Sequence, residues 1–166
     1  MNLLAAPLER SGIEVLLPHR SPILLVDRVT AFHGPPRSEL RASFRVAADH
    51  PILAGHFPGR PIWPGVLTIE GLAQTANLLG VLLPLIGEDG ALTVDLAAAR
   101  EPEAVAHRGL LASVEVKLLH VVEPGDLLEY AARLVGGRGP VHRVEVSAAV
   151  GRRVVARGSI AVAVES

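Results

Sequence analysis

The sequence contains no cysteine, one tryptophan, one tyrosine and, among its basic residues, a single lysine, Lys117. Without cysteine, the chain has no disulfide framework and no thiolate nucleophile. Its net charge of −1 gives no overall attraction to nucleic acid. The first ten residues lack a basic start followed by an apolar core of signal-peptide length. We therefore expect a cytoplasmic protein with no binding to nucleic acid and no membrane span.

The chain has 166 residues, of which 49% are hydrophobic and 20% charged, and these values suit a single domain over 1–166 with a well-filled core. Residues 1–11 are expected to fray. The seven histidines are scattered, with no pair at ligand spacing on one predicted element, so no metal site is predicted.

Residues 55–83 divide into a stiff loop and an apolar helix. Three prolines fix φ in the loop, and three glycines permit backbone shapes that other residues resist. The helix is predicted to begin at Pro64 or Gly65 and to end before Pro84. It is apolar on nearly every side, which indicates burial in a core or in a membrane. Glu70 and Gln74, one turn apart on one face, favour the soluble core.

His56 in the loop and Glu70 on the helix are candidates for acid–base chemistry. Desolvation on an apolar helix favours the protonated form of the Glu70 carboxyl. The prolines of the loop hold the His56 imidazole in a fixed place. An imidazole and a protonated carboxyl facing one cavity form a general base and general acid. The alternative is structural: a hydrogen-bonded loop histidine and a glutamate that caps a helix or pairs with arginine.

Alternating apolar and polar residues predict a set of strands around this helix. One buried helix followed by a meander of strands predicts an α+β fold. The predicted strands are 23–32, 39–46, 91–99, 110–122, 127–135, 141–150 and 154–164.

Three blocks of sequence resemble the β-hydroxyacyl-acyl-carrier-protein dehydratases of type II fatty-acid synthesis. They are GHFPGRPIWPGVLTIEGLAQ at 55–74, LPHRSPILLVDRV at 17–29 and the weaker VEPGD at 122–126. They lie in the order and at the spacing of that family. The resemblance implies a hot-dog fold, in which an antiparallel sheet wraps around one long central helix.

The resemblance also implies a mechanism. The substrate would be a (3R)-hydroxyacyl chain on the phosphopantetheine arm of acyl carrier protein, with no other cofactor. His56 would take a proton from C2, Glu70 would protonate the departing 3-hydroxyl, and the Gly65 amide would donate to the thioester oxygen. Gln74 would hold the Glu70 carboxyl or a water, or would bond to a neighbouring strand. The alternative explanation for Gly65 is a plain turn residue, which the rigid loop also needs.

The resemblance places further residues along a substrate channel. His19 is a second base in one interpretation and a structural histidine in the other. Trp63 stands where the family commonly has methionine, and the aromatic gate that often precedes strand 110–122 is absent. The predicted channel residues are Leu17, Pro18, His19, Phe57, Ile62 and Trp63.

The family shares its active site across a homodimer, in which the histidine of one chain faces the glutamate of the other, and its dimers often form hexamers. Carrier protein is acidic, so a basic docking patch is expected. The candidates are Arg20, Arg60, Arg152, Arg153 and Arg157, and solvated surface is the alternative explanation for the last three.

Three other functions compete with dehydration alone. A dehydratase-isomerase usually has aspartate where Glu70 stands. A hot-dog acyl thioesterase would lack the proline-framed arrangement of His56 and Glu70. A non-catalytic acyl-binding subunit of a hetero-oligomer would not need both residues.

Overall fold

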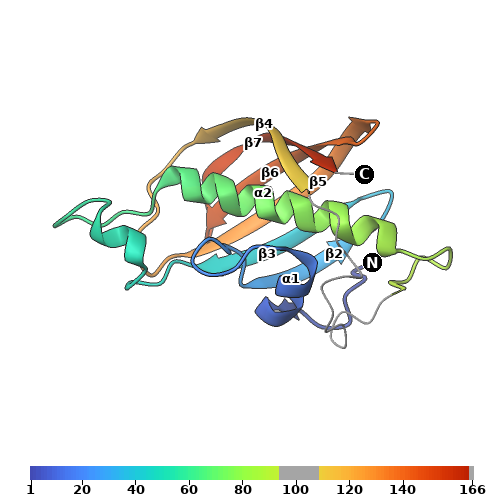
Figure 1. The fold of residues 1–166 in the computed structure, drawn as a ribbon, viewed down its shortest axis with the longest axis horizontal. Helices are drawn as coiled ribbons and strands as arrows, with labels where there is room; N and C mark the ends of the chain where they lie inside the picture. The colour runs from blue at the N-terminus through green and yellow to red at the C-terminus, as the bar shows by residue number, and fades with distance from the viewer. Residues whose placement is uncertain (94–108, 165–166) are drawn as a thin grey trace.

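The computed structural model describes residues 1–93 and 109–164, and in this part of the chain an antiparallel sheet of seven strands packs around helix α2, Gly65–Leu82 (Figure 1). The sheet order is β1-β2-β3-β5-β6-β7-β4. The predicted α+β hot-dog architecture is confirmed. The strands are β1 (Leu8–Glu9), β2 (Arg28–His33), β3 (Glu39–Arg45), β4 (Gly109–Leu118), β5 (Leu127–Arg138), β6 (Val141–Val150) and β7 (Arg153–Val164), and the short helices are α1 (Arg10–Leu16), η1 (Pro51–Ala54) and η2 (Leu83–Leu85).

Helix α2 has the predicted bounds. Pro64 precedes it in an extended conformation, and Pro84 lies in the short helix η2 that follows. The segment Gly65–Leu85 is long and apolar enough to cross a membrane, but 67% of its most apolar window is buried inside the chain's own fold. Burial by the sheet is typical of the core helix of a soluble protein.

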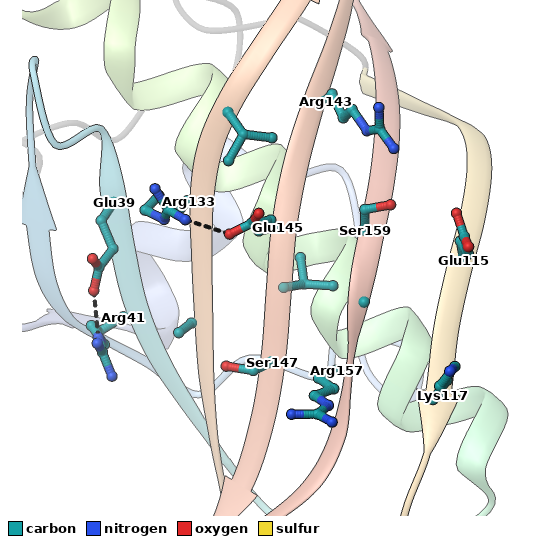
Figure 2. Close-up of a pocket in the computed structure, with 14 residues that line it drawn as sticks. Glu39, Arg41, Glu115, Lys117, Arg133, Arg143, Glu145, Ser147, Arg157 and Ser159 are labelled. Atoms are coloured by element: carbon teal, nitrogen blue, oxygen red, sulfur yellow. Dashed lines mark hydrogen bonds and ion pairs between the residues drawn. The ribbon is translucent and has the colours of Figure 1, made fainter.

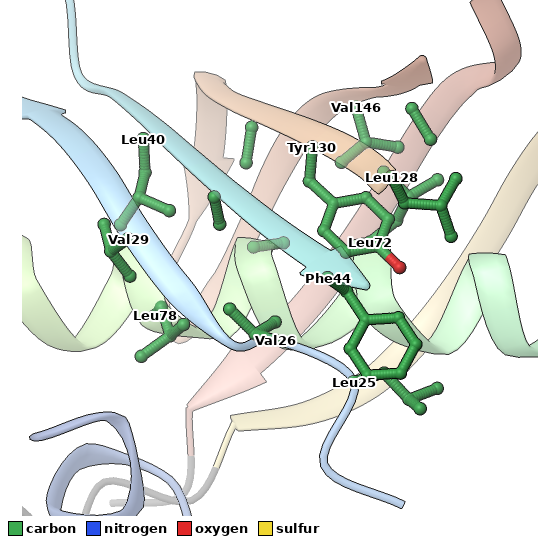
Figure 3. Close-up of a cluster of buried hydrophobic side chains, with 14 of the residues drawn as sticks. Leu25, Val26, Val29, Leu40, Phe44, Leu72, Leu78, Leu128, Tyr130 and Val146 are labelled. Carbon is green, nitrogen blue, oxygen red and sulfur yellow. The ribbon is translucent and has the colours of Figure 1, made fainter. Parts of the chain in front are cut away.

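The inner face of the sheet and helix α2 enclose the hydrophobic core (Figure 3). Strand β5 illustrates the alternation, because Leu128, Tyr130 and Ala132 are buried while their neighbours along the strand are less so. Tyr130 lies against Gly71 of helix α2, where a Cβ would meet the tyrosine hydroxyl. Glycine at this position therefore lets the helix approach the sheet closely.

The outer face of the sheet carries ion pairs between neighbouring strands (Figure 2). Arg133 on β5 pairs with Glu145 on β6, directly opposite in the register. The buried Glu39 accepts hydrogen bonds from Arg37 at 2.9 Å and Arg41 at 2.7 Å. Burial raises the pKa of Glu39, but these two arginines outweigh that effect and hold its pKa below the usual value of 4.5.

Strand β2 begins at Arg28, so the predicted start at Ile23 was wrong. The physical reason is the side chain of Gln74 on helix α2. Its Oε1 accepts from the amide of Leu25 at 2.8 Å, and its Nε2 donates to the carbonyl of Ile23 at 2.7 Å. These backbone groups are therefore bonded to the helix and not to a neighbouring strand.

The other strand predictions agree with the structure to within a few residues, and 141–150 matches β6. The predicted strand 91–99 lies largely outside the described residues. Residues 1–11, for which the sequence predicts fraying, contact β2 at several points and include the first residues of α1. The Leu3 amide donates to the Phe32 carbonyl at 2.8 Å, and Leu8–Glu9 forms β1.

Candidate active site

His56 is held by the proline-rich loop in one orientation. Its Nδ1 lies 2.9 Å from the carbonyl oxygen of Ile62, and a carbonyl can only accept, so Nδ1 carries the hydrogen and Nε2 is left as the basic nitrogen. The Ile62 amide donates back to the His56 carbonyl at 2.9 Å. The Phe57 ring stacks on the imidazole with centroids 4.1 Å apart. These contacts prepare the imidazole to accept a proton at one atom.

His56 lines a pocket of about 290 Å³ at the N-terminal end of helix α2. The first amides of a helix have no intrahelical acceptor, so Gly65 at position one has an amide that can donate to a ligand. A Cβ on Gly65 would meet Cδ1 of Leu118, the end of a half-exposed side chain, so a side chain at position 65 would require Leu118 to shift. The pocket is lined by His56, Ile62, Trp63, Gly65, Thr68, Leu118, Leu119, His120, Val121, Val122 and Val155.

Trp63 forms one wall of the His56 pocket. Its ring packs against Phe44 with centroids 5.6 Å apart and edge-on against His50 at 5.0 Å. Its amide donates to the Val122 carbonyl at 2.9 Å, which joins the loop to the segment after β4. The indole is therefore fixed on several sides and gives the pocket a rigid apolar boundary.

Glu70 lies in a second pocket, of about 230 Å³, with His19 and Gln74. The Nε2 of Gln74 donates to Oε1 of Glu70 at 2.8 Å, while His19 Nε2 lies 3.5 Å from the same oxygen. Because Gln74 is also bonded to Ile23 and Leu25, the carboxyl is tied to the segment before β2. Gln74 bonds to the carboxyl, and its other bonds go to a segment that precedes β2 and not to a strand.

The two pockets of one chain share no lining residue. Helical geometry explains the separation. Gly65 and Glu70 are five residues apart, which corresponds to a rotation of about 140° around the helix axis. His56 and the helix N-terminus thus lie on one side of α2, and Glu70, Gln74 and His19 on another.

A hollow of about 850 Å³ lies on the outer face of the sheet (Figure 2). Charged side chains from five strands line it, including the paired Arg133 and Glu145. It contains neither His56 nor Glu70 and is open to solvent. Its polar lining does not suit an acyl chain, so the candidate active site is the pair of smaller pockets.

The remaining predicted site residues are distributed as follows. Leu17 is buried in the core, and Pro18 is exposed, so neither lines either pocket of the single chain. Phe57 is exposed beside His56. Of the basic candidates, Arg20 bonds to the carbonyl of Leu17, and Arg157 lies on the outer face of the sheet.

Residues 1–93 and 109–164 contain no group of three or more histidine, cysteine, aspartate or glutamate side chains arranged to hold a metal ion.

Three residues that line the His56 pocket were not predicted as site residues from the sequence: Thr68, Leu118 and His120. The signal for Thr68 was its position one turn after Gly65. Leu118 is the last residue of β4 and His120 lies just after that strand, and local sequence gives no sign that either reaches this pocket.

Comparison with known proteins places this site in a family. The model of the FabA-like domain matches residues 17–159, which include every residue of the His56 pocket and every residue of the Glu70 pocket except Val162. The chain belongs to the FabA-like family. The match begins at Leu17 and therefore covers the loop with His19, the proline-rich loop and the whole of helix α2.

Relatives of this FabA-like chain include enzymes named 3-hydroxyacyl-[acyl-carrier-protein] dehydratase FabZ. The one from Polynucleobacter asymbioticus is 37% identical, with 91% of this chain and 89% of the relative covered. The one from Chlamydia trachomatis serovar L2 is 38% identical, with 89% of this chain and 86% of the relative covered. Among solved structures, the dehydratase heterocomplex ApeI:P from Xenorhabdus doucetiae has a TM-score of 0.64 at 17% identity, covering 93% of this chain and 91% of the other. That structural match supports the hot-dog fold alone.

Proposed function

We propose that this FabA-like chain is a hydro-lyase that converts (3R)-hydroxyacyl-acyl carrier protein to trans-2-enoyl-acyl carrier protein and water in fatty-acid synthesis. The observation that carries the proposal is the fixed imidazole of His56, with Nδ1 bonded to the Ile62 carbonyl and Nε2 as the basic nitrogen, in an apolar pocket that also contains the helix N-terminus. Dehydratases of this name share 33–38% of its sequence over about nine-tenths of the chain. We expect the reaction to take place in the cytoplasm.

The chemistry follows from the two pockets. His56 Nε2 removes a proton from C2, and the electron pair moves toward the thioester carbonyl, whose oxygen accepts a hydrogen bond from the Gly65 amide. The C3–O bond then breaks as the Glu70 carboxyl gives its proton to the departing hydroxyl, which leaves as water. The proton on His56 and the charge on Glu70 are exchanged with solvent to restore the starting state.

This reaction needs His56 and Glu70 in one cavity, and the separation of the pockets in a single chain supports a dimer. Strand β4 is an edge of the sheet and exposes apolar side chains, among them Leu110 at 52%, Leu111 at 48% and Leu118 at 50%. An exposed apolar edge strand is a template for pairing with another chain. We infer that β4 pairs with β4 of a second copy.

The position of the pockets along β4 supports the same arrangement. The Glu70 pocket touches the start of the strand, at Gly109, Leu110 and Leu111, and the His56 pocket touches its end, at Leu118. In an antiparallel pair centred on β4, the start of one strand lies opposite the end of the other. The Glu70 pocket of one protomer would then adjoin the His56 pocket of its partner. A hexamer of such dimers stays a prediction.

The test is an assay with 3-hydroxyacyl-carrier substrate that separates enoyl product, shifted alkene and free acid. We expect the enoyl thioester, because the relatives of this chain at 33–38% identity are named as dehydratases. His56→Ala should abolish turnover and Glu70→Gln should reduce it strongly. Near-normal turnover in both variants, or release of free acid by the wild type, would refute the proposal.

A further inference from the structure

The hydroxyl of Thr68 is a polar group in the His56 pocket with no role in the chemistry described above. Thr68 is 2% exposed and lines the pocket together with His56 and Gly65. Its hydroxyl makes no hydrogen bond to any residue in 1–93 or 109–164. A buried hydroxyl without a partner costs free energy, so this one calls for an explanation.

Thr75, on the same helix, shows what a helical threonine usually does. Its hydroxyl donates to the carbonyl of Gly71, four residues earlier, at 2.7 Å. Thr68 has no such bond to Pro64. In the described chain three side-chain polar atoms are inaccessible to solvent and have no hydrogen-bond partner. They are Nδ1 of His19, Nε1 of Trp63 and the Tyr130 hydroxyl. The Thr68 hydroxyl is not among them, and Thr68 lines the His56 pocket, where a bound substrate could supply the missing partner.

The direction of the side chain brings this hydroxyl toward Gly65. Side chains on a helix tilt back toward its N-terminus and lie over the preceding turn. Thr68 is three residues after Gly65, so it lies on nearly the same side of α2, one turn deeper. The amide of Gly65 and the hydroxyl of Thr68 therefore converge on the same part of the pocket.

The walls around these two donors are apolar, formed by Ile62, Trp63 and Leu118. A hydrogen bond in such surroundings is stronger than in water. Building on the proposed function, we propose that the Thr68 hydroxyl is a second donor to the thioester oxygen, beside the Gly65 amide. It donates a hydrogen bond as negative charge develops on that oxygen and transfers no proton.

The test compares Thr68→Val, which replaces the hydroxyl with a methyl group of similar size, with Thr68→Ser, which keeps the hydroxyl. Loss of one donor of this kind lowers kcat by about 100-fold, and we expect that loss in Thr68→Val and substantial recovery in Thr68→Ser. The matched control is Thr75→Val on the same helix, whose hydroxyl is outside both pockets and which should keep wild-type kcat. Circular dichroism and thermal unfolding of all three variants identify any that fail to fold.

A second measurement reports on the hydrogen bond itself. A trans-2-enoyl pantetheine thioester bound to the enzyme should have its carbonyl stretching band at higher wavenumber in Thr68→Val than in the wild type, because one donor is gone. An active wild type with unchanged kcat and an unchanged carbonyl band in Thr68→Val would overturn this inference alone. A wild type that makes no enoyl product would overturn the proposed function instead.

Discussion

His56 and Glu70 of one chain line different pockets, on different sides of helix α2. A base and an acid that act on neighbouring carbons of one substrate must lie in one cavity. We propose that a second copy of the chain completes the cavity in which the two residues meet. Several consequences of this arrangement can be measured.

The first prediction is complementation between two variants that each lack one of the two groups. In a 1:1 mixture of His56→Ala and Glu70→Gln, exchange of subunits gives mixed dimers in which one of the two sites has both residues intact. Random pairing predicts recovery of about a quarter of wild-type activity. The measurement is turnover after refolding the variants together, with each refolded alone as the control. No recovery in a sample with proven mixed dimers would indicate a site within one chain.

The second prediction concerns the edge strand. Val114 is near the centre of β4, where a two-fold axis would place it close to its own copy. Val114→Lys brings two like charges together in an apolar interface, so we expect monomers in sedimentation velocity and at least a 10-fold loss of activity. Val135→Lys is the control, because Val135 is similarly exposed but lies on β5. A fully active, dimeric Val114→Lys would contradict pairing through β4.

The third prediction concerns Gln74, which links Glu70 to the segment before β2. Gln74→Leu removes the hydrogen bond to the carboxyl and leaves the amide of Leu25 and the carbonyl of Ile23 without a partner. We expect a loss of about 1–3 kcal/mol in the free energy of unfolding, together with a lower kcat. Urea unfolding and steady-state kinetics measure the two effects. A stable variant with normal kcat would show that Glu70 is positioned by other groups.

The fourth prediction concerns Tyr130, whose buried hydroxyl has no partner in the described chain. Burial, together with the nearby charge of Asp27, raises the pKa of Tyr130, so the phenol stays neutral throughout the working pH range. Tyr130→Phe removes a buried hydroxyl that makes no hydrogen bond in the described chain. We expect the free energy of unfolding to rise by about 1 kcal/mol. A clear loss of stability would reveal a partner for the hydroxyl, such as a buried water.

The fifth prediction concerns pH and Glu39. Its pKa in the folded chain lies below the value of 4.5 that it has when unfolded. Its ion pairs with Arg37 and Arg41 therefore add stability above pH 4.5, and this contribution is lost as the pH falls through the folded pKa. Glu39→Gln should be less stable than wild type at pH 7 and should lose less stability on acidification. Urea unfolding of both proteins at pH 7 and at pH 4 or below measures how much of the free energy of unfolding each one loses on acidification.

The sequence by itself determined the local elements of this protein. Prolines at both ends set the bounds of helix α2, and alternating side chains located β3, β5, β6 and β7, because both signals depend on neighbours along the chain. The start of β2 could not be found in this way, since it depends on Gln74, 49 residues from Leu25. The long motif from Gly55 to Gln74 indicated the family and the candidate acid and base.

Only the tertiary structure decided how these parts combine into a site. The order of the sheet makes β4 an edge, and strand order depends on pairing between distant segments that no local pattern encodes. Folding also brought His19 to Glu70, Leu118 to Gly65 and the Thr68 hydroxyl into the His56 pocket. Each of these contacts joins segments far apart in the chain or depends on which side of the helix faces a cavity, so it is fixed by packing.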